Sequence, residues 1–329
     1  MTPRAKRSVT PRAKRSVTPR AKLSVTPRAK RSVTPRAKLS ETPRAKLSET
    51  PGLNSYNPFN TEEKMPNVYV SGVGGLGNCL FQLSAAIYYC EKYKYNLFLI
   101  KSSSLLLGTS NMFGRIKCHN DGKEILTYDK TIFNKLVFID KINEFSQIIH
   151  NDYTANHMII DGNLCITGYN QNLNLFKEFF HFIPRYLNLD DALIKEYITK
   201  KYGDLSSATV ICVRIGNDFS HMKKITPASY LKALASLGVT DAYVIGDAST
   251  DKFFGGSSGF KDVNESDIVQ LYFGMMCKNY ILSESTFHLW MAYLGTDFGK
   301  DLTKKVICFN NTDITNRNLQ LDSWIRMDC

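Results

Sequence analysis

The pattern of hydrophobic and polar positions changes near residue 66 of this chain of 329 residues. Beyond it, short runs of β-branched and aromatic residues alternate with segments whose apolar side chains recur every three or four positions, as strands and helices do. Residues 2–49 have no such periodicity, because one octapeptide with a proline is repeated six times there. We predict a disordered repeat tail and linker over 1–65, since its few apolar residues cannot offset the entropy of ordering.

The first part of the body, residues 66–190, begins with a predicted strand at 67–71, a glycine-rich stretch, a helix at 78–92 and a strand at 97–100. Such an order favours a parallel sheet, because parallel strands need a long connection that is usually a helix. Further elements are predicted as strands at 158–160 and 164–169 and helices at 173–186 and 190–201. The helix at 78–92 is expected to bury one face, formed by Leu80, Leu83, Ile87 and Cys90.

The second part, residues 191–329, shows the same alternation. Strands are predicted at 208–215, 241–247, 279–283 and 304–309, and helices at 227–237, 266–276 and 286–294. Two such series predict an α/β fold with two Rossmann-like domains that face a cleft. In open α/β sheets, ligands bind beyond the carboxyl ends of the strands, so these ends are where a site is expected.

Residues suited to binding a diphosphate follow the predicted strands of the second part. An arginine guanidinium can donate two parallel hydrogen bonds to phosphate, and hydroxyls at a helix start add donors beside its free N–H groups. Each residue also has a structural alternative: an ion pair for the arginine, a turn for an aspartate, a helix cap for a hydroxyl. The candidates are Arg214, Asp218, Asp247, Ser283, Ser285 and Thr286.

The glycine-rich stretch "SGVGGLGNCLFQLSAAIYY" begins at Ser71. Its glycines do not fit the dinucleotide fingerprint, since no acidic residue follows at the usual spacing, and an NAD site is not favoured. The sequence also lacks H-E-x-x-H and an acidic D-x-D between the two strand series. We therefore expect no metal or other cofactor, and arginine and helix dipoles would have to neutralise a bound diphosphate.

The positive charge belongs to the tail rather than to the body. Residues 2–49 hold fifteen Lys or Arg and two Glu, a net charge of +13, while the whole chain has +12. The body is thus almost neutral, and the overall charge does not indicate that it binds nucleic acid. The tail could contact an anionic polymer or a membrane surface, be phosphorylated at its Thr-Pro sites, or act as a solvated spacer.

No run of 18 apolar residues and no apolar N-terminal leader is visible. We therefore expect a location in the cytoplasm or at the periphery of a membrane. The eight cysteines are irregularly spaced, which favours a reducing environment.

Four segments resemble motifs of the alpha-1,2-fucosyltransferases and occur in the order of that family. "GGLGNCLFQLSAAIYY" is similar to G-G-L-G-N-Q-M-F-Q-Y-A-x-A, and "GYNQNLNLFKEF" to G-Y-x-Q-x-x-x-Y-F. "VICVRIGNDF" looks like H-x-R-R-G-D-Y, and "LYFGMMCKNYILSESTFHLWMAYL" resembles the family's C-K-x-x-I-x-x-N-S-T-F segment. The strand end "DAYVIGDAS" matches more loosely. Together the matches cover residue 67 to about residue 294.

The resemblance implies a GT-B fold and transfer of fucose from GDP-fucose to a galactose-type hydroxyl of a glycan, with inversion and without metal. It implies that Arg214 holds the β-phosphate, that Asp218 supports its loop, and that Ser285 and Thr286 receive the diphosphate. Asn78 would reach toward the donor phosphates or the acceptor and, with Arg214, is the catalytic candidate. Further substrate-binding candidates are Gly74, Gly75, Gly77, Gln82, Asp247 and Ser283.

The chain departs from the family at four positions. Cys212 replaces a histidine, Ile215 replaces the second arginine, Asn217 is an extra residue, and Glu284 replaces an amide. A carboxylate near a diphosphate weakens its binding. Three alternatives thus stay open: another sugar nucleotide as donor, another acceptor, or a non-catalytic glycan- or nucleotide-binding scaffold with a basic tether.

Overall fold

The computed structural model describes most of the body of the protein. The described residues are 65–72, 74–101, 116–118, 125–140, 142, 147–150, 162–168, 171–215, 225–246, 253–256, 259–310 and 312–329. Residues 62–329 form one compact unit. The predicted tail, apart from its last residue Met65, and the strand predicted at 158–160 lie outside the described residues.

A six-stranded, wholly parallel sheet organises the second part of the body, in the order β10-β9-β8-β11-β12-β13. A five-stranded parallel sheet organises the first part, in the order β5-β2-β1-β7-β6. The predicted α/β fold class, with two parallel sheets flanked by helices, is confirmed. The strands of the larger sheet are β8 (Thr209–Val213), β9 (Ala242–Gly246), β10 (Phe260–Asp262), β11 (Asn279–Ile281), β12 (Lys305–Phe309) and β13 (Ile325–Met327).

The smaller sheet places β1 between β2 and β7. A separate antiparallel pair, β3 (Ile116–Cys118) with β4 (Ile125–Thr127), follows β2 in the chain, and the sequence pattern did not predict it. The strands of the smaller sheet are β1 (Asn67–Val70), β2 (Asn96–Ile100), β5 (Phe138–Ile139), β6 (Gln147–His150) and β7 (Leu164–Thr167).

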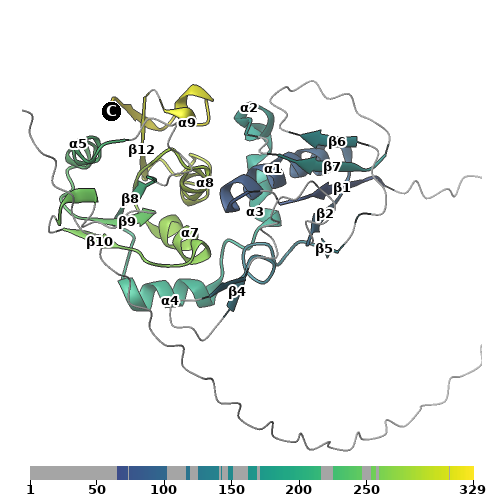
Figure 1. The fold of residues 1–329 in the computed structure, drawn as a ribbon, viewed down its shortest axis with the longest axis horizontal. Helices are drawn as coiled ribbons and strands as arrows, with labels where there is room; N and C mark the ends of the chain where they lie inside the picture. The colour runs from purple at the N-terminus through teal and green to yellow at the C-terminus, as the bar shows by residue number, and fades with distance from the viewer. Residues whose placement is uncertain are drawn as a thin grey trace, which may run out of the picture. The chain divides into compact units, whose positions relative to one another are not determined.

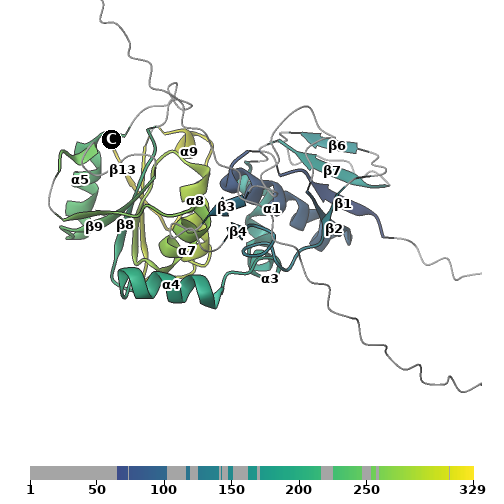
Figure 2. The same cartoon turned by 60° about the horizontal axis from the view of Figure 1, so that its bottom comes forward.

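Both faces of the larger sheet are covered by helices, as its apolar strands require. In β8, Val210 and Cys212 join the core on the side of α7 (Asp267–Met276) and α8 (Thr286–Gly295), while Ile211 and Val213 join the core on the side of α5 (Pro227–Leu237). Figures 1 and 2 show α5 on one side of the sheet and α7 and α8 on the other. The alternation follows because successive strand side chains point to opposite faces.

Helix α1 (Leu76–Tyr93) is buried nearly all round. The predicted face of Leu80, Leu83, Ile87 and Cys90 is buried as expected, and the burial extends to every residue from position 79 to position 90. One side of α1 packs on the smaller sheet, and another side packs on α8, where the rings of Phe81 and Trp290 meet with centroids 5.2 Å apart. A single hydrophobic core therefore runs from the smaller sheet through α1 to α7 and α8.

The helix predicted at 173–186 is interrupted. The chain forms α2 (Leu173–Phe176), a 3₁₀ helix (Lys177–Phe182) and α3 (Ile183–Tyr186). Pro184 provides a physical reason, because proline lacks the N–H of a helical hydrogen bond and its ring clashes with the preceding turn. The helix α4 (Ala192–Tyr202) follows, just after the domain boundary predicted at residue 190, which stays a prediction.

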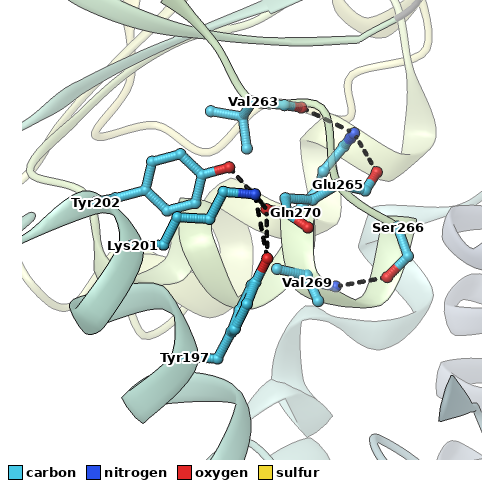
Figure 3. Close-up of polar contacts among 8 residues, drawn as sticks. All are labelled: Tyr197, Lys201, Tyr202, Val263, Glu265, Ser266, Val269 and Gln270. Atoms are coloured by element: carbon cyan, nitrogen blue, oxygen red, sulfur yellow. Dashed lines mark hydrogen bonds and ion pairs between the residues drawn. The ribbon is translucent and has the colours of Figure 1, made fainter. Parts of the chain in front are cut away.

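A buried carboxylate fastens α4 to the segment before α7 (Figure 3). Glu265 Oε1 accepts hydrogen bonds from Tyr197 at 3.1 Å, Lys201 at 2.6 Å and Tyr202 at 2.8 Å. The Glu265 side chain is fully buried, whereas that of Lys201 is 42% exposed. Hydrogen bonding to Glu265 raises the pKa of Lys201 above its usual range. This cluster therefore joins two segments of the second part of the body, α4 and the chain just before α7.

Candidate functional site

The start of α1 touches the start of α8 at a glycine. A Cβ atom on Gly77 would lie 2.4 Å from the Phe287 backbone nitrogen and 2.4 Å from the Thr286 carbonyl carbon. Real Cβ atoms do not approach backbone this closely, so only glycine permits this contact. The glycine-rich stretch and the segment "SESTF" are thus brought together from positions more than 200 residues apart.

Asn78 adds a polar contact at the same place. Its side-chain oxygen Oδ1 accepts a hydrogen bond from the Thr286 hydroxyl at 3.0 Å and a second from Gln171 Nε2 at 3.1 Å. Gln171 is buried, and its Oε1 accepts from the guanidinium of Arg317 at 2.6 Å. Two of the predicted site residues, Asn78 and Thr286, are therefore in direct contact, and two residues that were not predicted support them.

The N-terminus of α8 is not capped by a side chain. Ser285 occupies the N-cap position with extended backbone angles, but its hydroxyl makes no capping hydrogen bond. The structural alternative considered for Ser285, a conventional cap, therefore does not hold. The Thr286 hydroxyl donates to Asn78, so neither Ser285 nor Thr286 caps the backbone N–H groups at the positive end of the helix dipole.

Behind this helix start lies a buried histidine. His288 is 3% exposed, and its Nδ1 lies 2.6 Å from the hydroxyl oxygen of Ser283. Burial and, secondly, the positive charge of Arg214 lower the pKa of His288 to about 3. The imidazole is therefore neutral at physiological pH, and the influence of Arg214 on it shows that Arg214, Ser283 and His288 belong to one electrostatic neighbourhood.

The sheet register explains this neighbourhood. Ile281 of β11 is level with Ile211 of β8. Beyond these pairs, Arg214 directly follows the end of β8, and Glu284 is the third residue after the end of β11. Glu284 is buried and Arg214 is half-buried, so opposite charges follow two adjacent strands at their carboxyl ends.

Gln82 faces the backbone of the glycine-rich stretch. Its Oε1 accepts hydrogen bonds from the Gly72 N–H at 3.1 Å and the Ser71 hydroxyl at 3.5 Å, and the residue is fully buried. Gly72 and Gly74 have φ angles of 68° and 90°, a left-handed region that favours glycine. The contacts of Gln82 thus hold the turn that leads into α1, and its predicted contact with substrate stays a prediction.

The glycines of the stretch have three different roles. Gly74 belongs to the turn, Gly77 lies inside α1 at the contact with α8, and Gly75 is the extended N-cap of α1. A Cβ atom at Gly75 would meet nothing within 4 Å. The space at Gly75 is therefore open, in contrast to the tight contact at Gly77.

Two predicted site residues, Asp218 and Asp247, lie outside the described residues. Across the ranges that the structure describes, no three His, Cys, Asp or Glu side chains come together as a possible metal site. None of the described helices combines the length and the apolar character that crossing a membrane requires. The expected independence of metal stays a prediction.

Sequence reasoning missed Gln171, His288 and Arg317. Gln171 could have been found, because it is the glutamine of the segment "GYNQ" that matches the motif G-Y-x-Q. His288 and Arg317 carry no local signal, since neither belongs to a recognisable spacing of chemical groups. Their relevance appears only when α8 and the segment after β12 come together in the fold.

No protein-family model matches this chain, and no curated protein matches it either. Solved structures with some similarity include the fucosyltransferase NodZ from Bradyrhizobium, with a TM-score of 0.47 and 13% identity over 70% of this chain and 93% of that one. POFUT1 in complex with GDP-fucose gives 0.43 and 10%, over 72% and 95% of the two chains. A variant of Arabidopsis thaliana FUT1 in complex with GDP gives 0.39 and 14%, over 72% and 70%. Likeness at this level does not identify the family of this chain.

Proposed function

We propose that this protein is a glycosyltransferase that moves fucose from GDP-fucose to a galactose-type hydroxyl of a glycan. The observation that carries the proposal is the contact between Gly77 and the Thr286 backbone, with the hydrogen bond from Thr286 to Asn78 beside it. These residues belong to the two segments whose resemblance to the alpha-1,2-fucosyltransferases is most specific. A shared site would account for the presence of these residue types in both segments.

The groups at this place suit the departure of a nucleoside diphosphate. In an inverting transfer, the acceptor oxygen bonds to the anomeric carbon while the bond to the diphosphate breaks, and negative charge develops on the diphosphate. Preorganised donors stabilise that charge. Here they are the guanidinium of Arg214, the N–H groups at the start of α8 and the hydroxyl of Ser285, which is not used as a cap.

The buried His288 is neutral, so it adds no second positive charge to that of the Arg214 guanidinium. Glu284 counteracts the charge of Arg214, because its carboxylate lowers the positive potential at the same strand ends. Its presence is the observation that favours the alternative of a different donor or of a binding domain without catalysis.

Calorimetry on the full chain tests the donor class. GDP is expected to bind with a Kd in the millimolar range or tighter in the presence of EDTA, and UDP more weakly. Arg214→Ala should weaken GDP binding at least tenfold, because a charge-assisted hydrogen bond is lost. Arg185→Ala, which removes an exposed arginine on α3, is the matched control. Absence of GDP binding in the wild type would reject the proposal.

Catalysis and linkage need separate measurements. Slow release of GDP from GDP-fucose without acceptor would separate an enzyme from a binding domain, and its absence under all conditions would favour the scaffold. With galactosides as acceptors, NMR of the product should show an alpha-1,2 linkage. Activity that requires an added divalent metal would contradict the metal-independent mechanism.

The basic repeat tail is proposed to contact an anionic polymer or membrane surface, at a location in the cytoplasm or on a membrane periphery. The support is its net charge of +13 beside a nearly neutral body. Binding to anionic vesicles or to DNA should fall steeply with salt and vanish when residues 1–49 are deleted, while GDP binding stays the same. Salt-independent binding, or loss of GDP binding in the truncation, would contradict this role.

A further inference from the structure

A chain of directed hydrogen bonds reaches the start of α8 from the C-terminal part of the protein. Arg317 follows α9 (Asp313–Asn316), which comes after the carboxyl end of β12. Its guanidinium donates to Gln171 Oε1, Gln171 Nε2 donates to Asn78 Oδ1, and Thr286 donates to the same Oδ1. Four segments that are distant in sequence therefore share one polar network.

The orientation of both amides in this network is fixed by chemistry. A guanidinium can only donate, so Gln171 must present its oxygen to Arg317 and its NH₂ group to Asn78. Asn78 must in turn present its oxygen, which then serves both Gln171 and Thr286. The remaining polar group of Asn78, its Nδ2 amide, is thereby left as a donor for whatever binds at the start of α8.

The charges of the partners point to an anion. Asn78 is half-buried and Arg317 is an exposed residue, whereas Gln171 between them is buried. The buried Gln171 amide binds the Arg317 guanidinium through its oxygen and Asn78 through its NH₂ group. Arg317 and Asn78 thereby form a surface of hydrogen-bond donors. Together with the uncapped N-terminus of α8, such a surface recognises oxyanions.

We propose that Gln171 is a positioning residue of the candidate donor site, and that Arg317, which it holds, contacts the diphosphate of the bound nucleotide. Gln171 keeps Asn78 in the orientation in which Nδ2 points to the ligand. The site then has two cationic side chains, Arg214 from the end of β8 and Arg317 from the segment after β12. This inference rests on the proposed function, because it concerns the same nucleotide.

Gln171→Glu gives the sharpest test. A carboxylate still accepts from Arg317 but cannot donate to Asn78, so the Asn78 amide must turn its Nδ2 toward residue 171 and its oxygen toward the ligand. The new charge also offsets that of Arg317. We expect an unchanged or higher Tm, since an ion pair replaces a charge-assisted hydrogen bond to a neutral amide, together with GDP binding weakened about tenfold or more.

Ligand-observed NMR titrations with GDP and guanosine on the full chain separate positioning from general damage. In Gln171→Glu and Arg317→Gln, binding of GDP should fall about tenfold or more, while binding of guanosine, which lacks phosphate, stays as in the wild type. Arg317→Lys should restore part of the GDP affinity. Arg185→Gln, at an exposed arginine on α3, serves as the control and should change neither.

The outcomes are distinct. Wild-type GDP affinity in Gln171→Glu and Arg317→Gln overturns this inference and leaves the proposed function intact. A parallel loss of GDP and guanosine binding also overturns it, because a merely structural role would produce that result. Failure of the wild type to bind GDP rejects the proposed function itself, and this inference with it.

Discussion

The longer helices of this protein begin in two different ways. Among the described helices of ten or more residues, α4, α5 and α7 start with a side-chain cap. Asp191 accepts from the third residue after it, as do Thr226 and Ser266. The other two, α1 and α8, start at Gly75 and Ser285 without a side-chain cap.

The difference separates structural helix starts from the candidate site. A cap satisfies one of the orphan N–H groups of a helix from within the protein and stabilises it by about 1 kcal/mol. Helices α1 and α8 lack this stabilisation, and their starts are in contact at Gly77 and Thr286. We infer that their N–H groups are kept for a ligand, and the following experiments test that distinction.

Disrupting the contact between the starts of α1 and α8 should produce the largest change in the free energy of unfolding. Gly77→Ala places a methyl group within 2.4 Å of α8 backbone, so α1 and α8 must separate. We expect a loss of about 3 kcal/mol in the free energy of unfolding, at the upper end for overpacking. Gly75→Ala, where a Cβ meets nothing within 4 Å, is the matched control and should change stability by less than about 0.5 kcal/mol.

Urea unfolding of the three proteins measures this difference. Equal midpoints for the variants at positions 75 and 77 would show that the helix starts are not in tight contact. The comparison between capped and uncapped starts would then lose its structural basis.

The cluster of Glu265 (Figure 3) lies beside the capped start of α7 and should matter for stability alone. Glu265→Ala removes an acceptor shared by Tyr197, Lys201 and Tyr202. We expect a loss of about 2 kcal/mol, less than for a fully buried pair because Lys201 is 42% exposed. Below the melting transition, GDP affinity should stay as in the wild type. A selective loss of GDP binding would place this cluster in the site.

The sequence predicts most elements of the larger sheet because their hydrophobic patterns are strong and the residues that begin and end them lie next to them in the chain. The prediction at 227–237 coincides with α5, where Thr226 is the cap, Pro227 opens the first turn and Gly238 follows the last. Strands β8 and β12 are continuous apolar runs, as expected for strands buried on both faces. Local chemistry was sufficient for these elements.

Predictions failed where distant segments decide the outcome. The burial of α1 on several sides depends on α8, which lies more than 200 residues away in the chain. The hydrophobic pattern of α1 alone does not predict it. The same holds for Gly77, which resembles a turn residue in sequence and is a packing residue in space. Arg317 joins the network at Asn78 only through the fold, so neither its spacing nor its neighbours could have identified it.

His288 makes the uncapped helix α8 sensitive to acid. Its pKa is lowered to about 3, below its ordinary value near 6.5, so between these values the unfolded chain binds a proton that the native protein does not. Stability from this group is complete above about pH 6.5 and is lost as the pH falls toward 3, by up to about 1.4 kcal/mol per pH unit.

Replacement of His288 by asparagine should flatten this dependence between pH 6.5 and pH 5. His181→Asn, which removes an exposed histidine, should leave the slope of the wild type unchanged. Urea unfolding at several pH values gives the slopes. An equally steep loss of stability in His288→Asn would show that the buried imidazole is not the acid-sensitive group.

The two substitutions with the smallest expected effects compare a capped helix start directly with an uncapped one. Thr226→Ala removes the cap of α5 and should cost about 1 kcal/mol without altering GDP affinity. Ser285→Ala removes a hydroxyl that caps nothing, so stability should change little, while GDP binding weakens several-fold through the loss of one donor. Thermal unfolding and calorimetry on both variants measure the two effects. If Ser285→Ala instead lowered stability as much as Thr226→Ala and spared GDP binding, α8 would be an ordinary structural helix, because its first residue would be stabilising the fold rather than serving a ligand.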